Sequence, residues 1–190
     1  KKAVLRLYGN LALAYKILNR PDPYRDYLQK QVTLGNELVD RKTQAGALSA
    51  LGALEFQFNR FSSADSILQN ALQIQRSIGE KKDEAQTLSR LGQLYQAQAN
   101  YAGSLNYFLA SAALRTELNE RLELSNDWIG AGSAYRSLSQ YDSALSYFRT
   151  ALALKDSLGD IPGRANTLTQ LGIVYDYLGK ANLAEQFYRE

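Results

Sequence analysis

The chain of 190 residues is 45% hydrophobic, enough to bury a substantial core, and its formal net charge of +3 is too small to predict nucleic acid or an anionic membrane as the main partner. It contains no cysteine and no histidine, which excludes a disulfide framework, thiolate and imidazole metal ligands, and the commonest general base of enzymes. No apolar run reaches the roughly 20 residues that a membrane-spanning helix requires.

Helical spacing of apolar residues predicts helices along the whole chain. The first is expected over residues 2–18, and we expect Pro21-Asp22-Pro23 to break it. No segment has the alternating pattern of a strand. The helices after the first are expected over residues 24–38, 42–58, 62–78, 83–98, 102–118, 122–138, 142–158 and 162–178, with a last helix from Asn182.

A pattern of large and small residues returns every 40 positions. The pairs Leu51-Gly52, Leu91-Gly92 and Leu171-Gly172 share one phase, in which Gly132 also lies. A fixed period in this range is the signature of a repeat array. We therefore predict a single domain over residues 1–190, a continuous stack of antiparallel helix pairs whose repeats cover about 2–40, 41–80, 81–120, 121–160 and an incomplete 161–190.

The order of these residues resembles the tetratricopeptide repeat (TPR), which implies an all-α, right-handed α-solenoid of antiparallel helix pairs, the TPR superhelix, with about four and a half repeats. The resemblance covers nearly the whole chain, although Glu55 stands where tyrosine is expected. The period of 40 residues exceeds the common ~34 and is similar to the long repeats of scaffold proteins, kinesin light chains and regulatory regions of bacterial signalling proteins. In the fourth repeat the matching residues are Trp128, Ala131-Gly132, Tyr135, Ala144, Phe148 and Ala151.

Two features have a chemical interpretation as well as a structural one. Gly130-Ala131-Gly132 begins like a dinucleotide-binding loop, but that loop requires a preceding strand and a third glycine, and the repeat phase already explains this glycine. The 13 tyrosines beside 22 basic residues suit stacking on nucleic-acid bases, yet Tyr95, Tyr135 and Tyr175 share one repeat phase and are expected to pack between helices. We expect no enzyme activity, no cofactor and no metal site.

In the TPR family the first helix of each pair lines a concave groove where ligands bind, and the resemblance implies the same groove here. The carboxylate clamp of chaperone-binding repeats is not reproduced at the inward positions. Four inward cations against one inward acid predict a peptide with acidic and apolar side chains; the alternative is that the arginines pair with neighbouring acids and leave the groove nearly neutral. The candidate groove residues are Arg6, Lys16, Phe56, Gln86, Arg90, Gln93, Asn126, Ile129, Arg136, Asn166, Ile173, Asp176 and Tyr177.

The sequence therefore predicts a protein- or peptide-binding module that is the regulatory or sensory region of a larger signalling protein. Self-association through uncapped ends, without a separate ligand, is the alternative, and a sensor of a small molecule or nucleic acid is a third. The chain has no methionine and no signal peptide, and we expect it to be a fragment of a longer protein. Both the cytoplasm and the periplasm remain open as its location.

Overall fold

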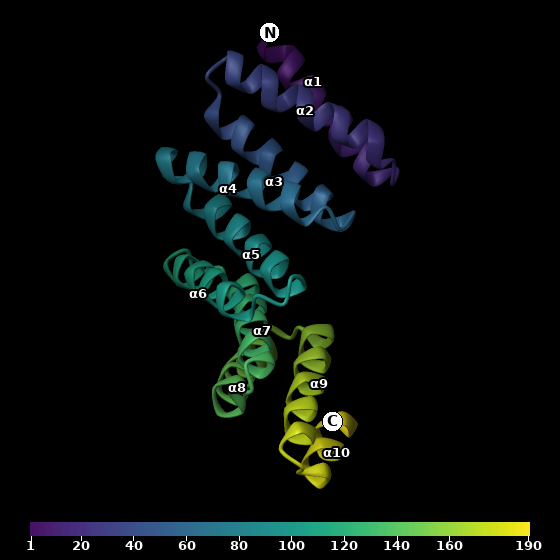
Figure 1. The fold of residues 1–190 in the computed structure, drawn as a ribbon, viewed down its shortest axis with the longest axis vertical. Helices are drawn as coiled ribbons and strands as arrows, with labels where there is room; N and C mark the ends of the chain where they lie inside the picture. The colour runs from purple at the N-terminus through teal and green to yellow at the C-terminus, as the bar shows by residue number, and fades with distance from the viewer. The chain divides into compact units, whose positions relative to one another are not determined.

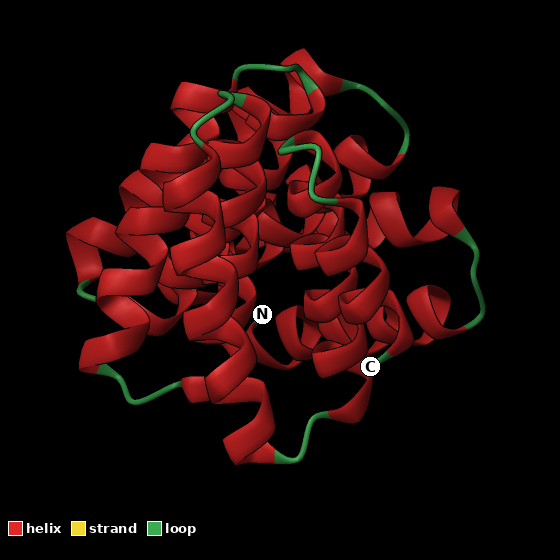
Figure 2. Cartoon of the chain, turned by 90° about the horizontal axis from the view of Figure 1, so that it is seen from below, coloured by secondary structure: helices red, strands yellow, loops and turns green.

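The computed structural model describes all residues 1–190, as helices joined by short turns and without a strand (Figure 2). The predicted all-α solenoid of antiparallel helix pairs is confirmed. None of the helices combines the length and the apolar content that a bilayer span requires. The helices are α1 (Lys2–Ile17), α2 (Pro21–Glu37), α3 (Arg41–Gln57), α4 (Phe61–Ile78), α5 (Lys81–Ala97), α6 (Tyr101–Glu117), α7 (Arg121–Ser137), α8 (Tyr141–Leu158), α9 (Ile161–Tyr177) and α10 (Ala181–Arg189).

The second helix begins earlier than the sequence predicted. α2 starts at Pro21 rather than at Tyr24, so its two prolines lie in the first turn instead of forming a break. A proline suits the first position of a helix because its fixed φ is helical and its missing N–H group would have no partner there. In the same way α9 carries Pro162 in its first turn.

Successive helices are joined by turns of one construction, which recurs every 20 residues. One residue in each turn has a positive φ, and the N–H group of the next residue donates to the carbonyl oxygen five positions before it, as from Asp40 to Gly35 at 2.8 Å. This is the hydrogen bonding of a Schellman motif, which satisfies carbonyl groups that the end of a helix leaves free. The residues with positive φ are Asn19, Val39, Asn59, Gly79, Ala99, Asn119, Ser139, Gly159 and Gly179.

Residues Lys1–Leu94 form one compact unit and Tyr95–Glu190 form another, with the boundary inside α5. In the first unit α1 packs on α2, and α3 packs on both α2 and α4 (Figure 1). The core between the first two helix pairs is built from small and aliphatic side chains: Ala12, Leu28, Ala47 and Leu51.

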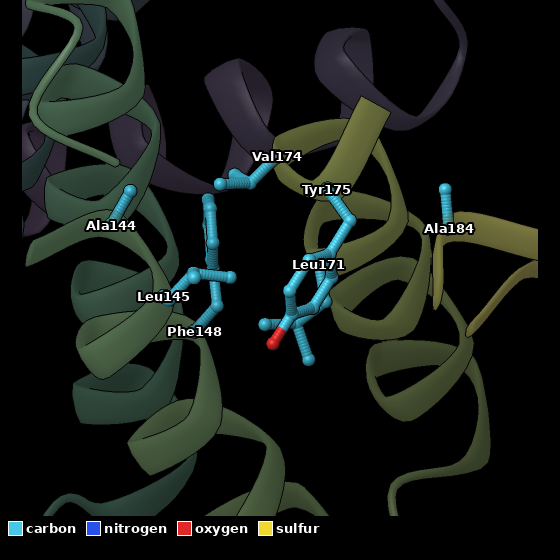
Figure 3. Close-up of a cluster of buried hydrophobic side chains, with 7 residues drawn as sticks. All are labelled: Ala144, Leu145, Phe148, Leu171, Val174, Tyr175 and Ala184. Carbon is cyan, nitrogen blue, oxygen red and sulfur yellow. The ribbon is translucent and has the colours of Figure 1, made fainter. Parts of the chain in front are cut away.

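In the second unit, α8, α9 and α10 share a core (Figure 3). Phe148 of α8 is fully buried and lies beside Leu171 and Val174 of α9. The repeat glycine Gly132 permits this packing, because a Cβ atom there would lie only 2.8 Å from the ring of Phe148. The glycine phase of the sequence thus marks a close approach between the two helices of a pair.

The tyrosines of one repeat phase pack against the second helix of their pair, as predicted. Tyr135 of α7 stacks on Tyr147 of α8 with 5.3 Å between ring centroids, and Tyr175 of α9 stacks on Phe187 of α10 at the same distance. Aromatic pairs at this separation contribute beyond the area that they bury. These rings therefore take part in the packing between helices.

Glu55 of α3 occupies the tyrosine phase of the second repeat. Its side chain is buried, and its carboxylate accepts hydrogen bonds from Arg25 Nε at 2.7 Å and from Arg60 Nη1 at 3.1 Å. Burial alone would raise the pKa of Glu55, but the two guanidinium groups outweigh burial and hold this pKa below its usual value. A network of ion pairs therefore replaces the aromatic contact in this repeat.

Candidate peptide-binding groove

Three hollows follow one another along α1 in the first unit, and we call them together the α1–α3 groove. Each is lined by residues of α1, α2 and α3, and neighbouring hollows share part of their lining. Lys16, Tyr24 and Ala50 line both the first hollow, of about 270 Å³, and the middle one, of about 350 Å³. Gln31 and Thr43 line both the middle hollow and the last, of about 550 Å³. The three hollows therefore adjoin one another along α1.

Small residues on facing helices keep the groove open. Gly9 and Ala12 of α1 line the middle hollow from one side, and Gly46 and Ala47 of α3 line it from the other. Outside the backbone of α3 itself, no heavy atom lies within 4 Å of the position that a Cβ atom would take at Gly46. A Cβ atom at position 46 would therefore lie in open space, next to the middle hollow that Gly46 lines.

Arg90 of α5 extends the first hollow, which we call the Arg90 hollow, beyond the first two helix pairs. Its Nη1 atom donates to Ser49 Oγ at 2.5 Å, and Ser49 Oγ lies 2.7 Å from Thr87 Oγ1. Burial lowers the pKa of the Arg90 guanidinium, and the charge of Asp83 opposes that shift without forming an ion pair. Arginine nevertheless stays protonated in proteins, so Arg90 presents a half-buried positive charge to the hollow.

Two further cations and several aromatic rings line the Arg90 hollow. Lys16 and Arg20 are exposed and have no acidic partner. Burial raises the pKa of Tyr24, while the nearby charge of Arg90 partly lowers it, so the phenol is neutral at physiological pH. No aspartate or glutamate lines this hollow, whose remaining lining is Tyr15, Asn19, Pro21, Ala50, Ala53, Leu54, Gln57 and Phe58.

The groove brings together only some of the residues predicted for the first unit. Lys16 and Arg90 both line the hollow at one end of the groove, and Arg6 lines the hollow at the other end. Phe56 packs against Phe61 of α4 with 6.0 Å between ring centroids and lines none of the three hollows. The candidates that are exposed on α5 and line none of these hollows are Gln86 and Gln93.

In the second unit, Arg136 donates to an uncharged side chain, as Arg90 does in the first unit. Its Nη1 atom donates to Gln170 Oε1 at 2.5 Å, a neutral amide of the following first helix. The alternative in which the groove arginines are neutralised by neighbouring acids is therefore wrong for Arg90 and for Arg136. Both keep an unneutralised charge.

The other candidates of the second unit are partly occupied by contacts within the fold. Asn126 accepts a hydrogen bond from the buried Lys155 at 2.7 Å. Asp176 accepts a hydrogen bond from Tyr188 Oη at 2.6 Å, which raises the pKa of Tyr188 to about 12. Ile129 packs against the core of α8 and α9, Tyr177 stacks on Tyr141 at 5.8 Å, Asn166 is exposed, and Ile173 is half-buried.

Sequence reasoning missed Arg20 and Tyr24 as groove residues. They lie on either side of Pro21-Asp22-Pro23, and the predicted break at this segment placed them outside the inward face of a first helix. The usable signal was the proline itself, because a proline suits the first position of a helix and so marks Pro21 as the start of α2. With α2 starting at Pro21, the turn after α1 becomes one wall of the Arg90 hollow.

Solved structures with the same fold come from several classes of protein. BtubC (BKLC) from P. vanneervenii is 18% identical, with a TM-score of 0.76 over 97% of this chain and 84% of that chain. A putative kinesin light chain with nearly identical TPR-like repeats from Podosopora anserina is 15% identical, with a TM-score of 0.81 over 100% and 93%. A Signal Transduction ATPase with Numerous Domains (STAND) protein with a tetratricopeptide repeat sensor, from Pyrococcus horikoshii, is 19% identical, with a TM-score of 0.83 over 97% of this chain and 30% of that chain.

Two comparisons of the sequence gave different results. No curated protein matches the chain significantly. The tetratricopeptide repeat model, in contrast, matches residues 83–157 and 127–190, which together make up more than half of the chain. With the helix pairs and the 40-residue phase, this match shows that the chain belongs to the tetratricopeptide repeat family.

Proposed function

We propose that the chain is a non-catalytic module that binds a protein through an extended peptide segment, and that it is the regulatory or sensory region of a larger signalling protein. The observation that carries the binding proposal is the α1–α3 groove, a row of adjoining hollows with unneutralised cations at one end. The regulatory part rests on likeness of fold: in the Pyrococcus horikoshii protein a similar array is described as a sensor.

The length of the groove matches that of a short extended peptide. α1 has 16 residues and is therefore about 24 Å long at ~1.5 Å per residue. An extended peptide rises ~3.3 Å per residue, so about seven residues span the groove. The amides of Asn10 and Gln31 line it and can both donate to and accept from a peptide backbone, and Leu13 offers an apolar contact.

The candidate residues of the second unit belong to the same proposal. Arg136, Ile173 and Tyr177 lie on first helices of their pairs, in positions that correspond to the groove face of the family. We propose that they contact a further part of the partner, and that all the repeats act as one domain. The unbroken 40-residue phase of the sequence supports this extension.

Blocking the groove at Gly46 tests the proposal. A random peptide library displayed on phage is selected on the wild-type chain, and the selected peptides are then measured on Gly46→Trp and Gly46→Ala by fluorescence anisotropy. Gly46→Trp should abolish binding by filling the middle hollow. Gly46→Ala adds only a methyl group in open space and should bind as the wild type does. Peptides that bind Gly46→Trp as tightly as the wild type would place the site outside the groove.

Self-association is a second candidate function, and a different surface favours it. Val4 and Leu7 of α1 are 40% and 52% exposed, and Val4, Tyr8 and Leu34 line a separate hollow of about 420 Å³. An apolar face of this kind can pack against a second copy of the chain. Light scattering should then give a mass that rises with concentration and falls back to that of a monomer in Val4→Glu. A constant monomer mass would remove this candidate.

A further inference from the structure

The Arg90 hollow differs from the rest of the α1–α3 groove in its charge. Three cationic side chains, Lys16, Arg20 and Arg90, line a space of about 270 Å³, and no carboxylate lines it. They come from the end of α1, the turn before α2, and α5, so the fold brings them together from three places in the sequence. A solvated helix surface usually mixes charges of both signs. This concentration of one sign indicates a site for an anion.

Arg90 is held in place for such a role. A guanidinium group carries five N–H donors in a planar fork, and the one hydrogen bond from Arg90 is that from Nη1 to Ser49 Oγ. The other N–H groups of Arg90, which lines the hollow, have no hydrogen-bond partner within the fold. The planar fork matches the two oxygens of a carboxylate or of a phosphate and binds either in a bidentate manner.

The surroundings of Arg90 make an incoming anion favourable. A charge that is taken partly out of water without a partner of opposite sign is costly, so a ligand that supplies this partner recovers that cost. The neighbouring phenol of Tyr24 stays neutral and can donate a further hydrogen bond. Tyr15, Leu54 and Phe58 add an apolar wall to the same hollow.

We propose that the Arg90 hollow is an oxyanion site, which binds a carboxylate or phosphate group carried by the peptide in the groove. Arg90 grips the oxyanion with its planar fork, Lys16 and Arg20 add charge at the open side, and the apolar wall receives the carbon atoms next to the anion. This inference rests on the proposed peptide-binding function and specifies the chemistry of its ligand. The proposal predicts that the peptide carries an acidic or phosphorylated residue next to an apolar one, and that both bind in the Arg90 hollow.

Small anions test the site without knowledge of the partner. Sodium acetate and inorganic phosphate are titrated separately into the ¹⁵N-labelled chain at constant ionic strength, balanced with chloride. Saturable shifts are expected for the Arg90 Nε–Hε signal and for the backbone amides around Arg20 and Ala53. The ion that binds more tightly shows whether a carboxylate or a phosphate is preferred.

Three variants decide whether the shifts report this site. Arg90→Gln and Arg20→Gln should each weaken binding of the preferred ion by about tenfold, because charge-assisted hydrogen bonds are the strong ones. Arg20 is exposed, so Arg20→Gln keeps the test valid even if Arg90→Gln unfolds. Arg149→Gln is the matched control, since Arg149 is also bonded to a neutral side chain, the hydroxyl of Tyr175, but lies in the other unit and is not among the proposed groove residues. It should leave these shifts unchanged.

The outcomes separate the oxyanion site from the binding function itself. Absence of saturable shifts with both ions, or equal weakening of ion binding by Arg149→Gln and Arg20→Gln, overturns the oxyanion site. The oxyanion site is also overturned by a peptide that does not bind Gly46→Trp but binds Arg90→Gln and Arg20→Gln as tightly as the wild type. In that case the groove remains a peptide-binding site. If the same peptide fails to bind both Gly46→Trp and Arg20→Gln, both proposals are supported.

Discussion

Arg90 Nη1 lies 2.5 Å from Ser49 Oγ, on the first helix of the preceding repeat. Ser49 is buried, and its hydroxyl also lies 2.7 Å from Thr87 Oγ1. One hydroxyl group therefore connects α3 to two side chains of α5 and fixes the direction in which the guanidinium of Arg90 points. The orientation of the proposed oxyanion site depends on this contact between repeats.

Removal of the Ser49 hydroxyl should weaken the oxyanion site through Arg90. In Ser49→Ala, Arg90 keeps its charge but loses its support, so we expect acetate or phosphate to bind severalfold more weakly in the NMR titration. Thr87, which is fully buried, also loses a partner, at a cost of about 1 kcal/mol in the free energy of unfolding. Ser133→Ala, another buried serine but in the second unit, is the control for the binding effect. Unchanged anion affinity in Ser49→Ala would mean that Ser49 does not position Arg90.

Val39 should be a point of backbone strain. It is a β-branched residue with φ of 57° at an exposed turn, a conformation that costs most residues roughly 1–2 kcal/mol but that asparagine adopts more readily. The same turn position is asparagine at Asn19, Asn59 and Asn119. Val39→Asn should therefore raise the free energy of unfolding by about 1 kcal/mol.

The reverse substitution is the matched control for the strain at Val39. Asn59→Val places a β-branched residue at the equivalent turn, with φ of 57°, and should lower stability by a similar amount. Both variants are measured by urea denaturation with a common m-value. Opposite signs are expected, and a loss of stability in Val39→Asn would contradict the assigned strain.

The ion pairs of Glu55 should make stability depend on acid pH. The pKa of Glu55 is lower in the folded chain than in the unfolded one, so its stabilising contribution is fully present above the unfolded pKa of about 4.3. It is lost as the pH falls through the folded pKa. Glu55→Gln should cost about 1–3 kcal/mol at pH 7 and flatten the decline of stability below pH 4.5.

The stability of Glu55→Gln should still decline at acid pH to some extent, because a second carboxylate, that of Asp160, also has a lowered pKa. A hydrogen bond from Lys155 and one from the backbone of Gly163 lower the pKa of Asp160. The comparison that matters is therefore the difference between wild type and Glu55→Gln in urea denaturation at pH 7 and at pH 3.5. A difference of equal size at both pH values would show that the two guanidinium groups do not hold Glu55 in its charged form.

Much of the fold could be predicted because each local signal agreed with the repeat. Glycine at one phase and tyrosine at another reappear as the close approach of Gly132 to Phe148 and the stacking of Tyr135 on Tyr147. The start of α2 was missed because proline was interpreted as a breaker, although it also suits the first turn of a helix. Hydrophobic periodicity does not distinguish these two uses.

The candidate site was less predictable, since its geometry depends on contacts between distant residues. Arg90 bonds to a residue 41 positions away and Arg136 to one 34 positions away. Periodicity tells which face of a helix a residue occupies, but not which partner its long side chain reaches. Asn126 illustrates the limit, because Lys155 of α8, 29 positions away, takes up its amide oxygen.

Overpacking should test the repeat glycine. A leucine at Gly132 would bring its Cβ to 2.8 Å from Phe148 Cε1, and the fully buried Phe148 has no free space to move into. Gly132→Leu should therefore cost about 1–3 kcal/mol or more, measured by thermal denaturation. Gly46→Leu, at a helical glycine with open space, is the control and should be close to neutral. Equal stability of the two variants would contradict the close approach.

Charge reversal should show which unit holds the anionic part of the partner. Arg90→Glu places a carboxylate among Lys16 and Arg20, so a selected acidic peptide should lose at least about tenfold in affinity. Arg90 is half-buried and loses its hydrogen bond to Ser49 in this variant, so a cooperative melting transition of Arg90→Glu is the control for folding. Affinity of the wild-type chain should also fall with added salt, since exposed charges are screened over ~8 Å at physiological ionic strength.

Arg136→Glu separates this effect from a general loss of positive charge. It makes the same change of net charge as Arg90→Glu, at an arginine that is also bonded to a neutral partner. If the oxyanion of the peptide binds in the Arg90 hollow, Arg136→Glu should weaken binding of this peptide much less than Arg90→Glu does. If Arg136→Glu causes the larger loss, the anionic anchor of the partner lies in the second unit. Because both variants carry the same net charge, the ratio of their affinities for one peptide decides between the two sites.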